Sequence, residues 1–192
     1  VFDGEELRGL LFGSHPMAIK KLSPFQQLVL TIGRASQLLR NISALRLLSK
    51  IWMPFAKKII IIGGDLVGLE LAEFLIERGR QVTVLEPTST LGSNLSIVRR
   101  SRVVYMLKEH GAILLTNVDI KEITKKEVIY SHADAEHHEA SNQVIIAIGA
   151  NPNLTLSESI KAAGISVNSV GDCTSAGYIH GAIADARNAT IN

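Results

Sequence analysis

A glycine-rich turn between an apolar stretch and a helix-like stretch is the first place where this sequence could do chemistry. Residues 63–68 read Gly-Gly-Asp-Leu-Val-Gly, which matches the dinucleotide-binding pattern G-x-G-x-x-G except that Asp65 replaces the middle glycine. In that pattern the first glycine permits the tight bend, the middle one lets a pyrophosphate approach the backbone, and the last lets helix and strand pack closely. Two of the three requirements are met. The residues expected to contact the dinucleotide here are Gly63, Gly64, Asp65, Leu66, Val67 and Gly68.

An acidic residue completes this candidate site. Glu86 follows the next apolar stretch, eighteen residues after Gly68. A carboxylate there can accept hydrogen bonds from both hydroxyls of the adenine ribose, and it repels a 2′-phosphate. The residues that follow, Pro87-Thr88-Ser89-Thr90, include no Arg or Lys to hold such a phosphate. The sequence therefore favours NAD(H) over NADP(H).

Asp65 has two interpretations. As a helix N-cap, its carboxylate would accept from N–H groups just inside the helix, which is worth about 1 kcal/mol. The same N–H groups are those that a pyrophosphate would use. An aspartate there would supply the anion from within the protein and would repel the cofactor, so we expect NAD affinity to be reduced or abolished.

The elements that position these residues follow a strand–turn–helix–strand rhythm. Strands are expected at residues 57–62, 81–86 and 113–116, and helices at 66–78 and 94–110. This order predicts an α/β fold with a Rossmann-like parallel sheet. Short strand-like segments at 118–124 and 127–132 suggest a β-meander, residues 144–148 a further buried strand, and residues 166–170 a strand before a helix from about Gly177.

The first fifty residues are expected to be helical and carry no chemistry. Ser23-Pro24 is a helix-start signal, and Met53-Pro54-Phe55 interrupts the helical pattern, so a boundary is expected near residue 55. Apolar residues recur at helical spacing, as expected of helices that pack on a core or on a missing neighbour. They are Leu7, Leu10, Leu11, Ile42, Leu45, Leu48, Ile51 and Trp52.

Three motifs in order carry a resemblance to a known family. Residues 61–75 read Ile-Ile-Gly-Gly-Asp-Leu-Val-Gly-Leu-Glu-Leu-Ala-Glu-Phe-Leu, residues 147–153 read Ala-Ile-Gly-Ala-Asn-Pro-Asn, and residues 170–173 read Val-Gly-Asp-Cys. From about residue 52 to 190 the chain resembles the nucleotide-binding region of pyridine nucleotide–disulfide oxidoreductase-type flavoproteins. It is most similar to the C-terminal region of old-yellow-enzyme-like NADH:flavin oxidoreductases, including 2,4-dienoyl-CoA reductase.

The resemblance implies a second cofactor and a division of the chain. In the family the NAD domain is inserted into a FAD domain, and the strand ending in Gly149 returns the chain to it. Gly171 would then approach FAD, with the Asp172 carboxylate on the ribityl chain and the helix from Gly177 pointing its N-terminus at the flavin. The expected segments are a helical linking segment (1–55), an NAD(H)-binding Rossmann-like domain (56–142) and the C-terminal part of a FAD-binding domain (143–192).

The adenosine-binding half of such a FAD site is not found. Glycines before Lys57 do not have the spacing of a second G-x-G-x-x-G; they are Gly4, Gly9, Gly13 and Gly33. FAD is therefore expected to bind only together with a missing N-terminal half-site, and the chain is either a fragment of a longer flavoprotein or a natural short protein. The expected partner is that missing segment or an upstream flavin domain, and self-association into a homo-oligomer is compatible with this expectation.

The expected function is the NADH-binding portion of a FAD-dependent oxidoreductase that passes hydride from NADH to flavin. The alternative is a degenerate Rossmann module with weak or no NAD binding, kept for packing or partner contact. No residue has the setting of a general acid or base, and the single cysteine, Cys173, excludes a C-x-x-C centre, so no catalytic residue is assigned. The substrate and terminal acceptor are not indicated.

Composition excludes several other classes. A formal net charge of +2 and the absence of any run of five or more like charges argue against nucleic acid. The apolar runs are too short to span a membrane. Without a signal-like N-terminus, a cytoplasmic protein is expected. His132, His137 and His138 could be metal ligands, but a solvated turn beside the meander is the preferred interpretation, so no metal is expected.

Overall fold

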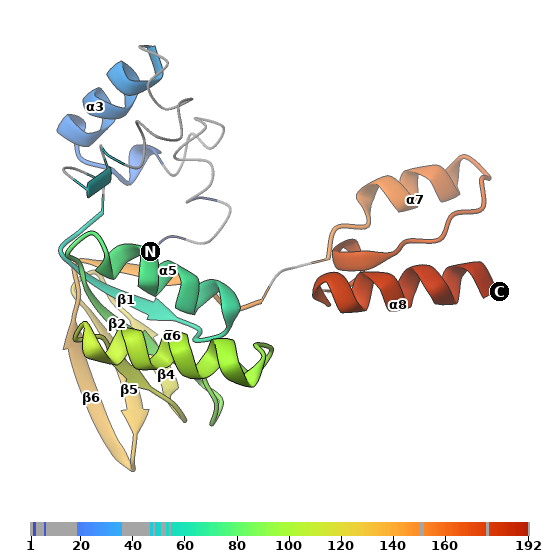
Figure 1. Cartoon of the computed structure of the whole chain (residues 1–192). Coiled ribbons are helices and arrows are strands. Elements are labelled where there is room, and N and C mark those ends of the chain that lie inside the picture. Colours follow the sequence, from blue (N-terminus) through green and yellow to red (C-terminus); the bar gives the residue numbers. More distant parts are fainter. Residues whose placement is uncertain are drawn as a thin grey trace. The chain divides into compact units, whose positions relative to one another are not determined.

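The chain forms two compact units, and each is described by itself. The computed structural model describes residues 2, 6, 19–35, 47, 49, 50, 53, 55–149, 152–175 and 177–191. The first unit is Val1–Ile148 and the second is Gly149–Asn192 (Figure 1). The strand Gln143–Ile146, which follows the boundary expected after residue 142, lies in the sheet of the first unit.

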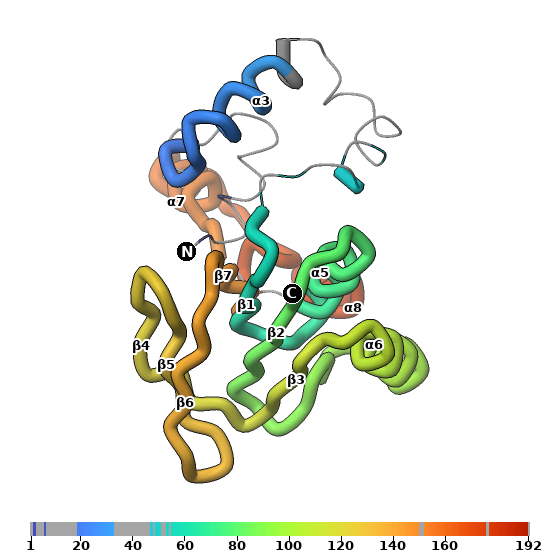
Figure 2. Tube along the Cα trace, turned by 90° about the vertical axis from the view of Figure 1, so that its left-hand side faces the viewer, coloured from blue at the N-terminus to red at the C-terminus, as the bar shows by residue number. Residues whose placement is uncertain are grey.

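A four-stranded parallel sheet is the centre of the first unit. Its strands are β1 (Lys58–Ile62), β2 (Gln81–Leu85), β3 (Ile113–Leu115) and β7 (Gln143–Ile146). Their order is β3-β2-β1-β7, and Figure 2 shows the strands side by side along the chain trace. Phe2 forms a parallel bridge with Ile145 beyond β7. The predicted α/β class is confirmed.

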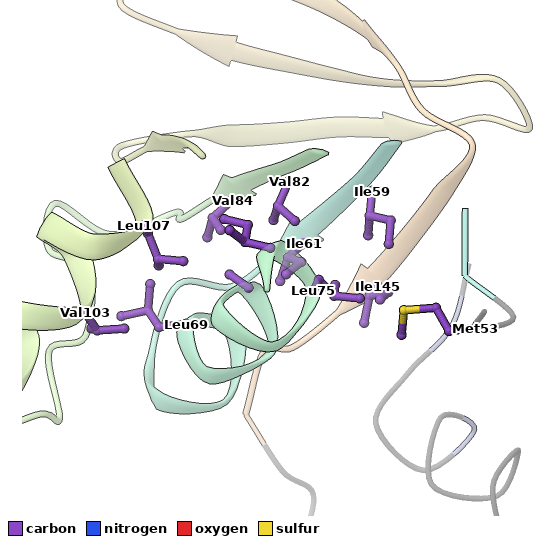
Figure 3. Packing of buried hydrophobic residues seen from close by; sticks show 12 residues of the cluster. Met53, Ile59, Ile61, Leu69, Leu75, Val82, Val84, Val103, Leu107 and Ile145 are labelled. Atoms are coloured by element: carbon purple, nitrogen blue, oxygen red, sulfur yellow. The ribbon is translucent and has the colours of Figure 1, made fainter. Parts of the chain in front are cut away.

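Alternating residues of β1 pack on two different layers. Ile59 and Ile61 face the helices α5 (Leu66–Ile76) and α6 (Ile97–Glu109), in the core of Figure 3 that also contains Leu69 and Leu107. Ile60 and Ile62 belong to the other cluster, to which β4 (Asp119–Ile123) and β5 (Glu127–His132) contribute. These two strands form an antiparallel sheet with β6 (Ala135–Ala140). Because both faces are covered, β1 is held rigidly where it delivers the chain to the glycine turn.

The meander has one strand more than expected. Residues 131–139, interpreted from sequence as a solvated turn, form the end of β5, a two-residue turn and most of β6. Ala133 and Asp134 have φ of 49° and 61°, the left-handed pair that a tight hairpin requires. The three histidines therefore lie on strands. Among the residues that the structure describes, no group of three His, Cys, Asp or Glu side chains is arranged to hold a metal ion.

One of these histidines should make stability depend on pH. The His138 ring lies 3.4 Å from a Glu127 carboxylate oxygen and 3.3 Å from one of Glu136. The hydrogen bond to Glu127 is the largest cause that raises the pKa of His138 above its usual 6.5. Its contribution to stability is therefore fully present below about pH 6.5 and is lost as pH rises through the raised pKa.

We expect His138→Gln to remove this part of the pH dependence. NMR titration of the ring protons should show His138 of the folded protein titrating above the histidines of the urea-unfolded chain. Urea unfolding at several pH values should show that acidification increases the free energy of unfolding less for the variant than for the parent. An equal pH dependence for both proteins would show that His138 is not linked to folding.

The N-terminal part contributes a capped helix. In α3 (Pro24–Ala35) the Ser23 hydroxyl accepts from the Gln26 N–H at 3.3 Å, and the Ser23 N–H donates to Gln26 Oε1 at 2.9 Å. This reciprocal capping box confirms the predicted helix start at Ser23-Pro24. The other residues on which the helical prediction rested, Leu7, Leu10, Leu11, Ile42, Leu45, Leu48, Ile51 and Trp52, lie outside the described residues.

The second unit is built from helices. It contains α7 (Thr155–Ala162), the 3₁₀ helix η2 (Gly171–Cys173) and α8 (Tyr178–Ile191). The predicted helix from Gly177 is confirmed, but residues 166–170 form no strand, because the described residues of this unit offer no other strand to pair with them. Within the ranges given above, no helix is both long and apolar enough to cross a membrane.

Candidate functional site

The turn after β1 needs glycine at its two ends. Gly63 has a φ of +106°, and a Cβ there would lie 2.6 Å from the Ala147 carbonyl oxygen. A Cβ on Gly68 would overlap the carbonyl oxygen of Gly63. The first glycine therefore makes the bend and the last lets α5 approach the turn, as their spacing predicts. Their contact with a dinucleotide is still a prediction.

Asp65 has an ordinary backbone conformation. Its φ of −89° and ψ of −165° are extended, a conformation open to any residue. The fold therefore does not require glycine at this position. What the Asp65 side chain changes is the space and charge beside the first turn of α5, where a dinucleotide pyrophosphate would lie.

The predicted capping hydrogen bond is not formed. Asp65 occupies the N-cap position of α5, but its side chain makes no capping hydrogen bond. Instead Oδ2 accepts from Nδ2 of Asn94 at 2.6 Å and Oδ1 accepts from the Asn94 backbone N–H at 3.2 Å. The proposed replacement of the pyrophosphate by this carboxylate at the helix N–H groups is therefore wrong for this conformation.

The loop after β2 lies against the glycine turn. The N–H of Gly92 donates to the Gly64 carbonyl at 2.8 Å, and the Leu95 N–H closes a turn on the Gly92 carbonyl at 3.0 Å. The helix expected from Asn94 therefore begins later, at Ile97, because Asn94 belongs to this turn. The contact between Asn94 and Asp65 could not be predicted from the sequence, because it depends on how the loop after β2 folds back onto the turn.

Glu86 lies directly after β2 and is 7% exposed. Its Oε2 accepts from the Gly64 N–H at 2.5 Å and its Oε1 accepts from the Thr88 N–H at 2.8 Å. Each carboxylate oxygen has further lone pairs, so the group can still accept from ribose hydroxyls. The structure thus brings Glu86 to the glycine turn, as the strand–turn–helix–strand order predicts.

Replacing Glu86 should affect both folding and binding. In Glu86→Gln one acceptor oxygen becomes an amide that faces a backbone N–H, so we expect a loss of about 1–3 kcal/mol in the free energy of unfolding. NADH affinity should also fall, because a ribose acceptor is lost. Urea unfolding and NADH titration measure the two effects. Glu77→Gln, on a 59% exposed side chain, is the control and should change neither; equal results for both variants would contradict the role of Glu86.

The remaining candidate residues lie in the second unit. Gly171 is buried with a φ of +79°, and its N–H donates to Asp185 Oδ2 at 3.1 Å. Asp172 Oδ1 accepts from the Gly177 N–H at 3.2 Å, so this carboxylate lies at the start of α8. Gly149, with a φ of +60°, is the first residue of this unit.

Asp185 is a residue that sequence reasoning missed. Its Oδ2 also accepts from the Thr174 hydroxyl at 3.2 Å, and it thereby ties η2 to α8. Cys173 is a free thiol whose Sγ lies 3.2 Å from the Val170 carbonyl. Cys173 is half-buried at this turn.

The site residues thus fall into two groups. The first unit brings together Gly63, Gly64, Asp65, Leu66, Val67, Gly68 and Glu86. The second contains Gly149, Gly171 and Asp172. The first group has the glycine geometry and the strand-end carboxylate of a dinucleotide site, and the second has a carboxylate beside a helix start.

Comparison with known proteins agrees with this geometry. The chain is 33% identical over 116 residues to a bilirubin reductase of Mediterraneibacter gnavus; the aligned region covers 60% of the chain and 18% of the relative. It is 27% identical over 129 residues to an NADH oxidase of Thermoanaerobacter brockii; this aligned region covers 66% of the chain and 20% of the relative. A solved 2-naphthoyl-CoA reductase matches 74% of the chain and 22% of its own length, with a TM-score of 0.63 and 25% identity. The chain thus spans about a fifth of each of these proteins.

A family model covers most of the chain. It matches residues 22–182 and describes pyridine nucleotide-disulphide oxidoreductases. This range contains the glycine turn, Glu86 and the Gly171-Asp172 pair. The chain therefore belongs to the pyridine nucleotide-disulphide oxidoreductase family.

Proposed function

We propose that this chain is the NADH-binding portion of a FAD-dependent oxidoreductase. The observation that carries the proposal is the buried Glu86 carboxylate hydrogen-bonded to Gly64 in the glycine turn. When bound, the nicotinamide supplies a hydride and the flavin accepts it. The chain's own residues bind and orient: the turn and the first N–H groups of α5 for the pyrophosphate, and Glu86 for the adenine ribose.

Glu86 is also the basis for proposing NADH over NADPH. A 2′-phosphate would meet this carboxylate, which the backbone N–H groups of Gly64 and Thr88 hold in place. Residues 87–90 contain no Arg or Lys to compensate. We therefore expect NADPH to bind more weakly than NADH, most clearly at low salt, where charge repulsion is least screened.

Residues of the second unit are proposed to meet FAD. The Asp172 carboxylate, which accepts from the Gly177 N–H at the start of α8, is proposed as the ribityl acceptor, and Gly171 lacks a side chain that would hinder close approach. We propose residues 56–142 as the NAD(H)-binding domain and residues 143–192 as the C-terminal part of a FAD-binding domain. The adenosine half of FAD would be held by a further FAD-binding segment or an upstream flavin domain, as in old-yellow-enzyme-like NADH:flavin oxidoreductases.

The alternative, a degenerate module kept for packing or partner contact, is favoured by one observation. Asp65 places a negative charge beside the pyrophosphate position. If that charge prevents binding, the fold would persist without its ligand, because the backbone at Asp65 is unstrained.

The test is a fluorescence titration of the purified chain with NADH and with NADPH, without added flavin, because FAD binding needs the further segment. NADH should bind saturably and more tightly than NADPH. Equal affinities for the two cofactors would contradict the role proposed for Glu86. If NADH shows no binding, even by Asp65→Gly, the degenerate module is the better description.

A further inference from the structure

Asn94 has no assigned role, yet its side-chain amide and its backbone N–H both donate to the Asp65 carboxylate, at 2.6 and 3.2 Å. We propose that Asn94 is a positioning residue of the cofactor site. It holds the Asp65 carboxylate away from the first turn of α5, so that the N–H groups there are left for the NADH pyrophosphate. The proposal rests on the proposed function and explains how the turn can accept an aspartate where a glycine is expected.

Without Asn94, the Asp65 carboxylate would be drawn to the helix. Asp65 already has the extended backbone of an N-cap residue, and aspartate is among the residues preferred there. The Leu69 N–H donates to the Asp65 carbonyl, whereas the N–H groups before it have no acceptor within the helix. The positive end of the helix attracts a carboxylate as it does a phosphate. A capping Asp65 would therefore compete with the cofactor.

The loop that carries Asn94 is also held by contacts that do not involve Asp65. Gly92, two residues earlier, is tied to the Gly64 carbonyl and forms a turn with Leu95. A Cβ on Gly92 would lie 2.9 Å from Leu95 Cδ1 and 3.1 Å from Leu69 Cδ1, so the turn is packed against α5. Asn94 is thus carried on a fixed loop and offers two donors in the right place, without adding a charge.

Four proteins test the proposal: the parent, Asn94→Ala, Asp65→Gly and the double variant. NADH affinity is measured by fluorescence titration. Asn94→Ala should weaken NADH binding about fivefold, the equilibrium equivalent of one N-cap interaction of about 1 kcal/mol. In the Asp65→Gly background the same change should have no effect, because no carboxylate is left to restrain. Hydrogen exchange of the residue 66–68 amides, measured without NADH, should be slower in Asn94→Ala than in the parent.

Two results would overturn the proposal. One is unchanged NADH affinity and unchanged amide exchange in Asn94→Ala. The other is an equal loss of affinity in both backgrounds, which would mean that Asn94 acts on the cofactor or the loop directly. If none of the four proteins binds NADH, the proposed function fails, and the exchange of residues 66–68 alone decides whether Asn94 restrains Asp65.

Discussion

Asp65→Gly should bind NADH at least about tenfold more tightly than the parent chain, a difference of about 1.4 kcal/mol. The variant removes a negative charge beside the pyrophosphate position, where the repulsion of two anions a few ångströms apart amounts to about this much or more after screening. The backbone should not change, because the φ of −89° and ψ of −165° at Asp65 are open to glycine as well. Fluorescence titration with NADH at low and moderate salt measures the effect.

Asp65→Asn separates the charge from the size of the side chain. If the charge dominates, this variant should recover most of the gain of Asp65→Gly, and the gain should shrink as salt is added. If the volume dominates, only Asp65→Gly should gain. Equal NADH affinity for the parent and both variants would contradict the placement of the pyrophosphate beside residue 65.

Gly68→Ala should have the largest effect on stability, a loss of about 3 kcal/mol or more in the free energy of unfolding. Its new Cβ would overlap the Gly63 carbonyl oxygen, which is backbone and cannot rotate away. The turn or α5 must then shift, and α5 packs on the core around Ile61 and Leu69. Urea unfolding followed by circular dichroism measures the loss.

Gly111→Ala is the control for this prediction. Gly111 has a φ of +80° and nothing within 4 Å of an added Cβ, so alanine there should cost only the backbone strain, about 1–2 kcal/mol. A loss at Gly68 no greater than that at Gly111 would show that α5 does not approach the turn as closely as described.

The part of the fold that sequence predicts well is the part specified locally. Three features can be recognised from a few consecutive residues each. They are the apolar run of β1, the glycines at both ends of the turn and the acidic residue after β2. Glu86 is an example: its place at the strand end predicts its proximity to the turn, and its hydrogen bond to Gly64 realises it. Each of these residues contacts a part of the chain that the order of strands and helices already brings close.

Features that depend on distant pairing were not predictable in this way. The sequence of β6, Ala-Glu-His-His-Glu-Ala, is polar throughout; it is a strand because β5 pairs with it along its whole length. Asn94 fits the expected helical segment, but the Gly92 contact with Gly64 turns it toward Asp65. Residues 166–170 show the reverse case, in which a strand-like run lacks a partner within its own unit.

The βαβ unit from Lys58 to Glu86 is proposed to bind NADH. NMR titration of the isotope-labelled chain with NADH tests it most directly, because it locates even weak binding residue by residue. The predicted result is saturable shifts concentrated in the amides of residues 63–68 and of Glu86 and Thr88, larger with NADH than with NADPH at equal concentration. Shifts that are absent from these residues, or equal for both cofactors, would contradict the claim.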